Sequence, residues 1–272
     1  MSKNNQSYTE RQRREIEYHR VYAKKLTNSL DSPISYDIIS SKNRHWWSAH
    51  WEMYSFLLKH ELAKKKILVV GCGLGHDALY LSKMGADVEA FDLSTEMIAI
   101  AKKLADREKL KVNFYVMPAE DLDFKSDLFD CVLLRDVLHH INISIGLKEI
   151  VRVSKKGALF VANEIYTHSI ADKIRHSSIV DRYIYPRMKN FVYNNNYYCT
   201  EDERKLNEQD VFQIKEIVKN LEKEKYFNFF VLRFIPKKYH ILSKIDRSLL
   251  MMLQPVSHLL GGRVVLAGSI NK

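Results

Sequence analysis

The sequence has few cysteines, glycines and prolines for its length, and it lacks any long apolar run. Its 272 residues include three cysteines, nine glycines and five prolines. The cysteines Cys72, Cys131 and Cys199 are scattered and form no C-x-x-C pair, which argues against a disulfide framework and favours a reducing, cytoplasmic compartment. Apart from the histidine pair at 139–140, no cluster of Cys, His, Asp or Glu has the spacing of metal ligands, so we expect no metal site.

Membrane-spanning and exported classes are disfavoured by the same kind of absence. No stretch reaches the ~18 apolar residues of a membrane span. The first twenty residues are too polar for a signal peptide. We therefore expect a soluble protein, or at most one peripheral to a membrane.

Positive charge, by contrast, is in excess. The net charge is +10 and the sequence pI is near 9.3, with the excess concentrated toward both ends of the chain. Ordinary solubility charge is the first explanation and an anionic lipid or glycan surface the second. Nucleic acid ranks last, because no basic face with interleaved aromatics and no recognisable nucleic-acid-binding module is present.

The middle of the chain alternates short apolar runs with helical patterns. Strands are expected at 67–70, 87–92, 112–117, 129–136 and 157–164, with helices at 76–85, 94–108 and 143–154 between them. Such alternation predicts an α/β fold with a parallel sheet covered by helices on both faces. Before it we expect helices at 8–26 and 44–62, and after it a helix at 208–223 and strands at 226–236 and 262–270.

The stretch "ILVVGCGLGHDALYL" places three glycines between an apolar strand and a helix. Gly71, Gly73 and Gly75 would leave backbone N–H groups and the helix N-terminus facing one crevice. Asp92 ends the next strand, where a carboxylate can accept hydrogen bonds from both ribose hydroxyls of a nucleoside. A dinucleotide loop needs glycine at the sixth position, which here is His76, so the spacing favours S-adenosylmethionine over NAD.

Three stretches together resemble the class I S-adenosylmethionine-dependent methyltransferases. They are "ILVVGCGLGHDALYLSKMGADVEAFDLSTEMIAIAK", "MPAEDLDFKSDLFDCVLLRDVLHHI" and "EIVRVSKKGALFVANE", and they cover about residues 65 to 165 in the family's order. The subgroup resembled methylates small molecules, lipids and saccharides. The resemblance implies a Rossmann-like, seven-stranded, mostly parallel sheet with an antiparallel last strand; "FVLRFIP" and "RVVLAGSI" would be the sixth and seventh strands.

The resemblance also implies a domain organisation. Residues 1–63 would form a helical cap or lid, 64–272 the methyltransferase domain, and 165–210 a substrate-recognition insertion after the fifth strand. Within that insertion Arg175, Arg182 and Arg187 could clamp an anionic group, although a solvated flap is an equal alternative.

By the same resemblance the cofactor is S-adenosylmethionine, with S-adenosylhomocysteine as product. The residues that it assigns to cofactor binding are Gly71, Cys72, Gly73, Gly75, Asp92, Leu93, Met97, Ala119, Glu120 and Arg135. Two positions depart from the family's pattern: Val69 replaces an acid two residues before the first glycine, and Pro118 replaces an aspartate near the adenine.

Candidate catalytic residues follow the fourth strand. They are Asp136, His139 and His140, since histidine is a natural general base for an alcohol. The alternative for the histidine pair is packing at a helix start. Candidate substrate contacts are Tyr18, Tyr22, Trp47, Glu164, His168 and Arg182. For the aromatic residues among them, ordinary packing is the alternative.

The acceptor is the least determined part. We expect O-methylation of a hydroxyl on a glycan or lipid-linked saccharide, with a small-molecule N- or O-methyltransferase, an RNA methyltransferase and a non-catalytic binding subunit as alternatives. The basic and apolar segment at 235–271 could lie on a membrane surface. Packing against the sheet before the last strand is favoured.

Overall fold

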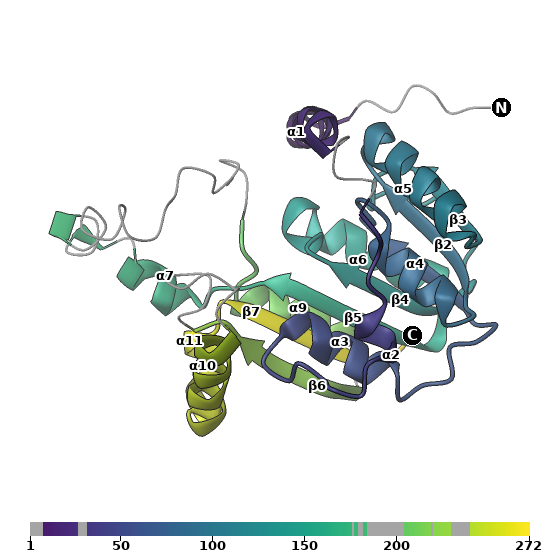
Figure 1. Cartoon of the computed structure of the whole chain (residues 1–272). Coiled ribbons are helices and arrows are strands. Elements are labelled where there is room, and N and C mark those ends of the chain that lie inside the picture. Colours follow the sequence, from purple (N-terminus) through teal and green to yellow (C-terminus); the bar gives the residue numbers. More distant parts are fainter. Residues whose placement is uncertain are drawn as a thin grey trace.

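A seven-stranded sheet forms the centre of the protein in the computed structural model (Figure 1). The structure describes residues 8–26, 32–175, 177–178, 182–183, 204–218, 220–229 and 240–272. The strand order is β3-β2-β1-β4-β5-β7-β6. The strands span Lys66–Val70 (β1), Asp87–Asp92 (β2), Val112–Val116 (β3), Phe129–Arg135 (β4), Ser154–Ile165 (β5), Asn220–Phe227 (β6) and Arg263–Ser269 (β7).

The first five strands run parallel, and β7 is antiparallel to both of its neighbours. β7 begins at Arg263, which pairs with Ile165 of β5, so its first residue lies at the carboxyl ends of the parallel strands. This confirms the α/β fold and the antiparallel last strand. It also puts the first residue of β7 beside the ends of β4 and β5.

Helices cover both faces of the sheet because βαβ crossovers put them there. One core contains α3 (Ala49–Leu57), α4 (His76–Lys83) and α5 (Thr95–Glu108). The other contains α6 (Ile143–Val153), α9 (Glu208–Ile217) and the short η2 (Leu138–His140). Ser94 caps α5 as expected, its hydroxyl accepting a hydrogen bond from the Met97 N–H at 3.2 Å.

Two expectations about the last third were wrong. The helix expected at 208–223 ends at Ile217, and the sixth strand is Asn220–Phe227 rather than a strand within 226–236. The strand "NLEKEKYF" lies at the edge of the sheet, where charged residues such as lysine are favoured. Its charged composition therefore resembles a continuation of the preceding helix. Residues 230–239, which include most of the apolar run, lie outside the described residues.

The elements at the chain's two ends lie beside the sheet. The helix α1 (Glu10–Leu26) packs by α5, and the short α2 (Asp37–Ser40) precedes α3. The second N-terminal helix is shorter than expected, because 45–48 form a turn before Ala49. Beyond β6, α10 (His240–Met252), η4 (Gln254–Val256) and α11 (Ser257–Leu260) lead into β7, while α7 (Ser169–Arg175) follows β5.

Candidate functional site

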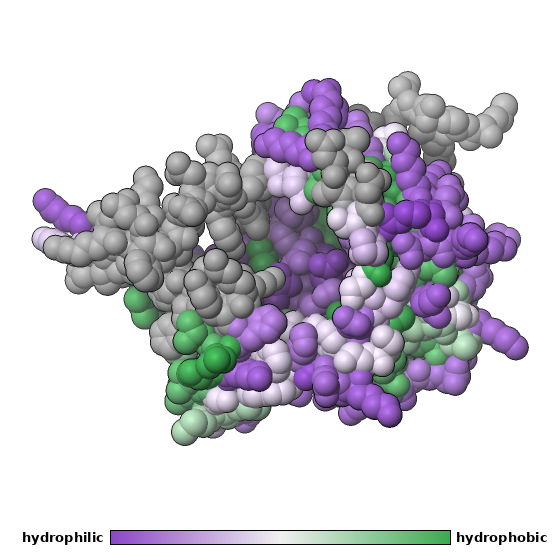
Figure 2. All heavy atoms as spheres, viewed as in Figure 1, coloured by the Kyte–Doolittle hydropathy of each residue, from purple (hydrophilic) through white to green (hydrophobic). Residues whose placement is uncertain are grey.

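A cavity of about 620 Å³ lies between α1 and the ends of the central parallel strands. Figure 2 shows a recess lined mainly by hydrophilic residues in the middle of this face, below α1. Ligands of open α/β sheets bind at this edge, beside the point where the strand order reverses. The residues of its wall that concern us are Glu15, Tyr18, His19, Tyr22, Gly71, Cys72, Gly73, Asp92, Leu93, Ala119, Glu120, Arg135, Asp136, His139, His140 and Arg263.

The glycine loop after β1 forms the floor of the cavity. Gly71 has φ +59° and Gly73 φ +51°, a left-handed backbone that side chains disfavour. A Cβ on Gly71 would lie 2.4 Å from Val137 Cγ2, whereas a Cβ on Gly73 would meet nothing within 4 Å. Gly71 is therefore required by packing, and Gly73 faces open space.

Asp92, at the end of β2, is fixed by two backbone donors. Its carboxylate accepts hydrogen bonds from Gly73 N–H at 2.8 Å and from Ser94 N–H at 2.9 Å. The side chain is buried but lines the cavity. Each carboxylate oxygen has a further lone pair, so Asp92 can still accept bonds from two adjacent hydroxyls.

The turn after β4 is held by one buried carboxylate, Glu164 on β5. Glu164 accepts hydrogen bonds from Val137 N–H at 2.9 Å and Leu138 N–H at 3.0 Å, and its second oxygen lies 2.8 Å from His139 Nδ1. With Nδ1 protonated toward that carboxylate, His139 Nε2 carries the lone pair. This arrangement gives His139 one tautomer and one orientation in the cavity wall.

Asp136 lies at the end of β4 in an unusual conformation. Its φ of +57° lies in the left-handed region, which is sparsely populated and is often found at functional sites. Its carboxylate pairs with Arg263 of β7 and lies 3.7 Å from Arg135 Nη1. Burial raises the pKa of Asp136, but the two arginines outweigh burial and hold it below its usual range, so the carboxylate is charged at neutral pH.

Arg135 is in turn anchored from below. Its Nε donates to Asp77 of α4 at 2.6 Å, and Asp77 also accepts a bond from Tyr54 Oη at 2.8 Å and lies 3.2 Å from His50 Nε2. Burial raises the pKa of Asp77, but Arg135 and His50 bring it well below its usual range. Asp77 raises the pKa of Arg135, which stays charged. The network ties α3, α4 and β4 together beneath the cavity.

The helix α1 forms the roof through polar contacts. Glu15 lies 3.0 Å from His19 Nε2 and 3.4 Å from His140 Nδ1. Gln12 donates to Glu120 at 3.2 Å. The Nδ1 of His19 is buried and has no hydrogen-bond partner among the described residues. A buried polar atom of this kind calls for a ligand or water as its partner.

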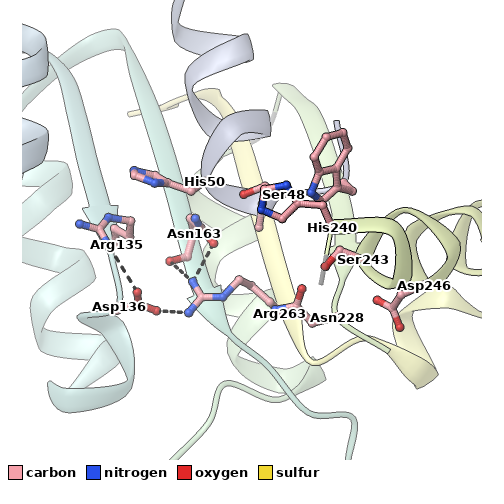
Figure 3. Close-up of a pocket in the computed structure, with 12 residues that line it drawn as sticks. Ser48, His50, Arg135, Asp136, Asn163, Asn228, His240, Ser243, Asp246 and Arg263 are labelled. Carbon is pink, nitrogen blue, oxygen red and sulfur yellow. Dashed lines mark hydrogen bonds and ion pairs between the residues drawn. The ribbon is translucent and has the colours of Figure 1, made fainter. Parts of the chain in front are cut away.

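A second, smaller pocket of about 210 Å³ adjoins the cavity and shares Arg135, Asp136 and Arg263 with it (Figure 3). Figure 3 shows Arg263 between Asp136 and Asn163, to both of which it is hydrogen-bonded. The remaining wall comes from the turn before α3, the start of α3, the end of β6 and α10, with the residues Trp47, Ser48, Ala49, His50, Asn228, His240, Ser243 and Asp246. We call it the side pocket.

Most residues singled out in the sequence surround the cavity, and several do not. Gly75 caps α4, where an added Cβ would lie 2.9 Å from Ala101, and Met97 is buried in the core. Glu164 is 1% exposed with both oxygens engaged, so it supports the turn instead of facing a substrate. Trp47 lines the side pocket.

The residues expected after the fifth strand lie elsewhere. His168 faces the His258 ring at 5.7 Å, and Arg182 is exposed; neither lines the cavity. Of the other arginines in the insertion, Arg187 and the side chain of Arg175 lie outside the described residues. Sequence reasoning missed Asp77 and Arg263. For Arg263 the available signal was its place at the first residue of the antiparallel strand.

S-adenosylmethionine fits the residues of this cavity. Open space begins at Gly73, and Asp92 offers acceptors for a pair of ribose hydroxyls. The apolar Leu93 and Met117 with the backbone at Ala119 can hold an adenine ring. Carboxylates and arginines in the same wall suit a zwitterionic tail. Val69 is buried in the core, outside the cavity wall, and Pro118 lies in it beside Glu120.

Comparison with known proteins agrees with the fold and the loop. Residues 68–162 match a family described as a methyltransferase domain. The uncharacterized methyltransferase YodH of Bacillus subtilis is 36% identical over 98 residues, covering 36% of this chain and 42% of that protein. A ubiquinone biosynthesis O-methyltransferase of Pelagibacter ubique is 35% identical over 99 residues, covering 36% and 41%. The chain thus matches less than half the length of these relatives.

Among solved structures, magnesium protoporphyrin IX methyltransferase from Synechocystis, with bound S-adenosylhomocysteine, has a TM-score of 0.57 at 13% identity. The match covers 97% of this chain and 100% of that one. At this identity the likeness concerns the fold alone. The strand order and the glycine loop agree with the match of residues 68–162 to a methyltransferase domain.

Proposed function

We propose that this protein transfers a methyl group from S-adenosylmethionine to a hydroxyl of a small saccharide-type acceptor, free or lipid-linked. The observation that carries the proposal is the side pocket, which meets the cofactor cavity at Asp136 and Arg263. An acceptor held there would present its edge to the cavity beside His139.

The cofactor, when bound, supplies an electrophilic methyl group on a sulfonium sulfur and leaves as the neutral thioether. The protein has three tasks: to hold the acceptor in line, to exclude water and to take the hydroxyl proton. Asp92, Gly73 and the loop at Ala119 would hold the cofactor's nucleoside. The helix α1 would act as the lid that excludes water.

His139 is the proposed general base. Its contact with Glu164 favours the tautomer with the Nε2 lone pair, and the imidazolium formed on taking the acceptor's proton would be stabilised by the same carboxylate. Asp136 is a weaker base because its two arginines lower its pKa. Its role is to accept a hydrogen bond that orients the acceptor.

The side pocket's chemistry supports a polyol acceptor. Carboxylate and amide groups at Asp136, Asn163 and Asp246 can engage adjacent hydroxyls, which are both donors and acceptors. Trp47 adds an aromatic wall, stacked on His45 at 4.8 Å between ring centroids. The pocket's volume of about 210 Å³ suits one sugar ring.

The first test is calorimetric titration of S-adenosylmethionine and S-adenosylhomocysteine into the full chain. We expect micromolar binding for the wild type and a loss of at least about tenfold, ~1.4 kcal/mol, for Asp92→Ala. Absence of binding to a folded wild-type protein would overturn the proposal in favour of a non-catalytic binding subunit.

The second test screens acceptors with methyl-labelled cofactor, starting with saccharides and lipid-linked saccharides. Trp47→Ala should raise the acceptor KM about tenfold and leave S-adenosylhomocysteine affinity unchanged, while Trp47→Phe keeps most of the activity. Labelling of amines but not of sugar hydroxyls would contradict the acceptor class while leaving the cofactor result intact. Methylation of RNA, with binding that weakens steeply in salt, would contradict it too.

A further inference from the structure

The helix α10 is amphipathic with its polar side turned inward. Positions 243, 246, 247 and 250, which share one face at helical spacing, are its buried residues. Three of these are Ser243, Asp246 and Arg247. The opposite stripe contains Ile241, Ile245 and Met252, which are 73%, 52% and 81% exposed. An apolar face on a surface helix normally packs inward, so this one calls for a partner.

The inward polar residues are engaged, so the orientation of α10 has a cause. Asp246 accepts a hydrogen bond from Phe229 N–H at 3.1 Å. Arg247 donates to the Tyr226 carbonyl and lies 4.1 Å over the Phe227 ring. If α10 were rotated to bury its isoleucines, these bonds would break. Ser243 and Asp246 would then no longer line the side pocket and would face solvent.

The exposed apolar surface extends past α10. Leu253 and Val256 continue it into η4, and Ile170 and Ile174 lie one turn apart on α7, which packs against α11. Figure 2 shows hydrophobic residues gathered at this corner of the molecule, over α10, α11 and α7. We call this surface the α10 face, defined by Ile170, Ile174, Ile241, Ile245, Met252, Leu253 and Val256. Contiguous apolar patches of this kind mark interaction sites.

Two exposed lysines border the α10 face. Lys173 lies on α7 between the isoleucines, next to the half-buried Asp172, and Lys244 lies on α10 with its ammonium 4.6 Å from the centroid of the Trp47 ring. The chain as a whole carries +10. An apolar helix face flanked by lysines suits the interface of a bilayer with anionic headgroups. A second copy would bring like charges together.

We propose that the α10 face docks on the surface of an anionic phospholipid bilayer, with α10 lying in the interfacial plane. The opposite side of the same helix lines the side pocket through His240, Ser243 and Asp246. Docking would therefore hold the acceptor pocket next to the membrane, where a lipid-linked acceptor is presented. This last step rests on the proposed function; the docking itself does not. In the part of the chain that the structure describes, no helix has the length and apolarity of a membrane span.

The test is co-flotation of the full chain with vesicles of phosphatidylcholine alone or with about 30% phosphatidylglycerol, at ~0.1 M and ~0.5 M salt. We expect binding to the anionic vesicles that falls at the higher salt, and about tenfold weaker binding for Ile245→Glu/Met252→Glu. The matched control is Ile145→Glu, which changes an exposed isoleucine at the start of α6, on another helix. It should bind vesicles like the wild type.

Calorimetry with S-adenosylhomocysteine on the same samples reports folding and keeps the two proposals separate. The double variant should keep the cofactor affinity of the wild type, because neither residue lines the cavity. Failure of the wild type to bind anionic vesicles would overturn the docking proposal, as would equal binding by the double variant. A wild-type dimer in light scattering that the double variant abolishes, without vesicle binding, would assign the α10 face to a second copy.

Discussion

Single residues at the cavity do different jobs that the sequence does not distinguish. Gly71 and Gly73 read as equivalent glycines, yet one packs under Val137 and the other faces open space. Glu164 and Asp92 are both buried carboxylates at strand ends. Both oxygens of Glu164 are engaged by the turn after β4 and by His139, whereas Asp92 can still accept hydrogen bonds from a ligand in the cavity. Neighbours across the sheet decide these roles.

Alanine at the two glycines should separate stability from cofactor binding. Each replacement costs about 1–2 kcal/mol for the left-handed backbone, but only Gly71→Ala also places a Cβ 2.4 Å from Val137 Cγ2. We expect Gly71→Ala to lower the free energy of unfolding by about 2 kcal/mol more than Gly73→Ala. Gly73→Ala should mainly weaken S-adenosylhomocysteine binding. Urea unfolding and calorimetry measure the two effects; equal losses of stability would contradict the distinction.

The cofactor loop could be predicted from the sequence because its signal is local. The glycine spacing, Ser94 as N-cap and Asp92 at a strand end each depend on a few neighbouring residues. Arg263 and Asp77 could not be predicted in the same way. Arg263 reaches Asp136 only because β7 runs antiparallel beside β5, and Asp77 meets Arg135 only once α4 lies against the sheet.

At the scale of elements, α1 and β6 show where local patterns mislead. The charged sequence of α1 predicts a helix but says nothing of its position over the cavity. That position depends on Gln12 meeting Glu120 and on Glu15 meeting His140, which are far away in the sequence. The strand β6 has a charged sequence that resembles a helix. Charged side chains are favoured in an edge strand, so β6 lacks the regular apolar alternation that identifies strands in a sequence.

The contacts of α1 predict a pH-dependent roof. For His19, burial lowers the pKa, but the Glu15 hydrogen bond and the Asp92 charge raise it overall, so its contribution is complete below the ordinary value of 6.5 and is lost as pH rises through the raised pKa. For Glu15, burial raises the pKa, but His140 and His19 lower it overall, so its contribution is complete above 4.5 and is lost only in stronger acid. Docking of α1 is strongest between these two values.

S-adenosylhomocysteine should therefore dissociate several-fold more slowly near pH 6 than at about pH 8.5. Stopped-flow displacement measures the rate. The control is His19→Gln, which keeps a hydrogen-bonding side chain without the charge and should flatten the profile between those pH values. Identical profiles for the two proteins would show that His19 does not hold the roof.

For the whole molecule, ligand binding should stabilise the fold as one unit. The cavity wall draws on α1, the loop after β1, β2, β4, β5 and β7, so a bound ligand contacts elements from both ends of the chain. S-adenosylhomocysteine at about one hundred times its Kd should add ~2.7 kcal/mol. The Tm should rise by roughly 5–10 °C.

Scanning calorimetry with and without the ligand measures this shift, and Asp92→Ala at the same ligand concentration is the control. A single transition that moves as a whole is expected. A shift confined to one of two transitions would indicate that α1 or the α10 region unfolds independently of the sheet.

The place of β7 has a consequence for how the chain is made. β7 is the last strand in sequence but lies between β5 and β6, so β6 has no partner in the sheet until residue 269 has been synthesised. During translation, β1 to β5 and then β6 therefore leave the ribosome before β7. Until β7 follows, the edge of β5 that pairs with β7 stays open, and β6 has no neighbouring strand. A nascent chain stalled between β6 and β7 would present an apolar open edge, the kind of species that chaperones bind.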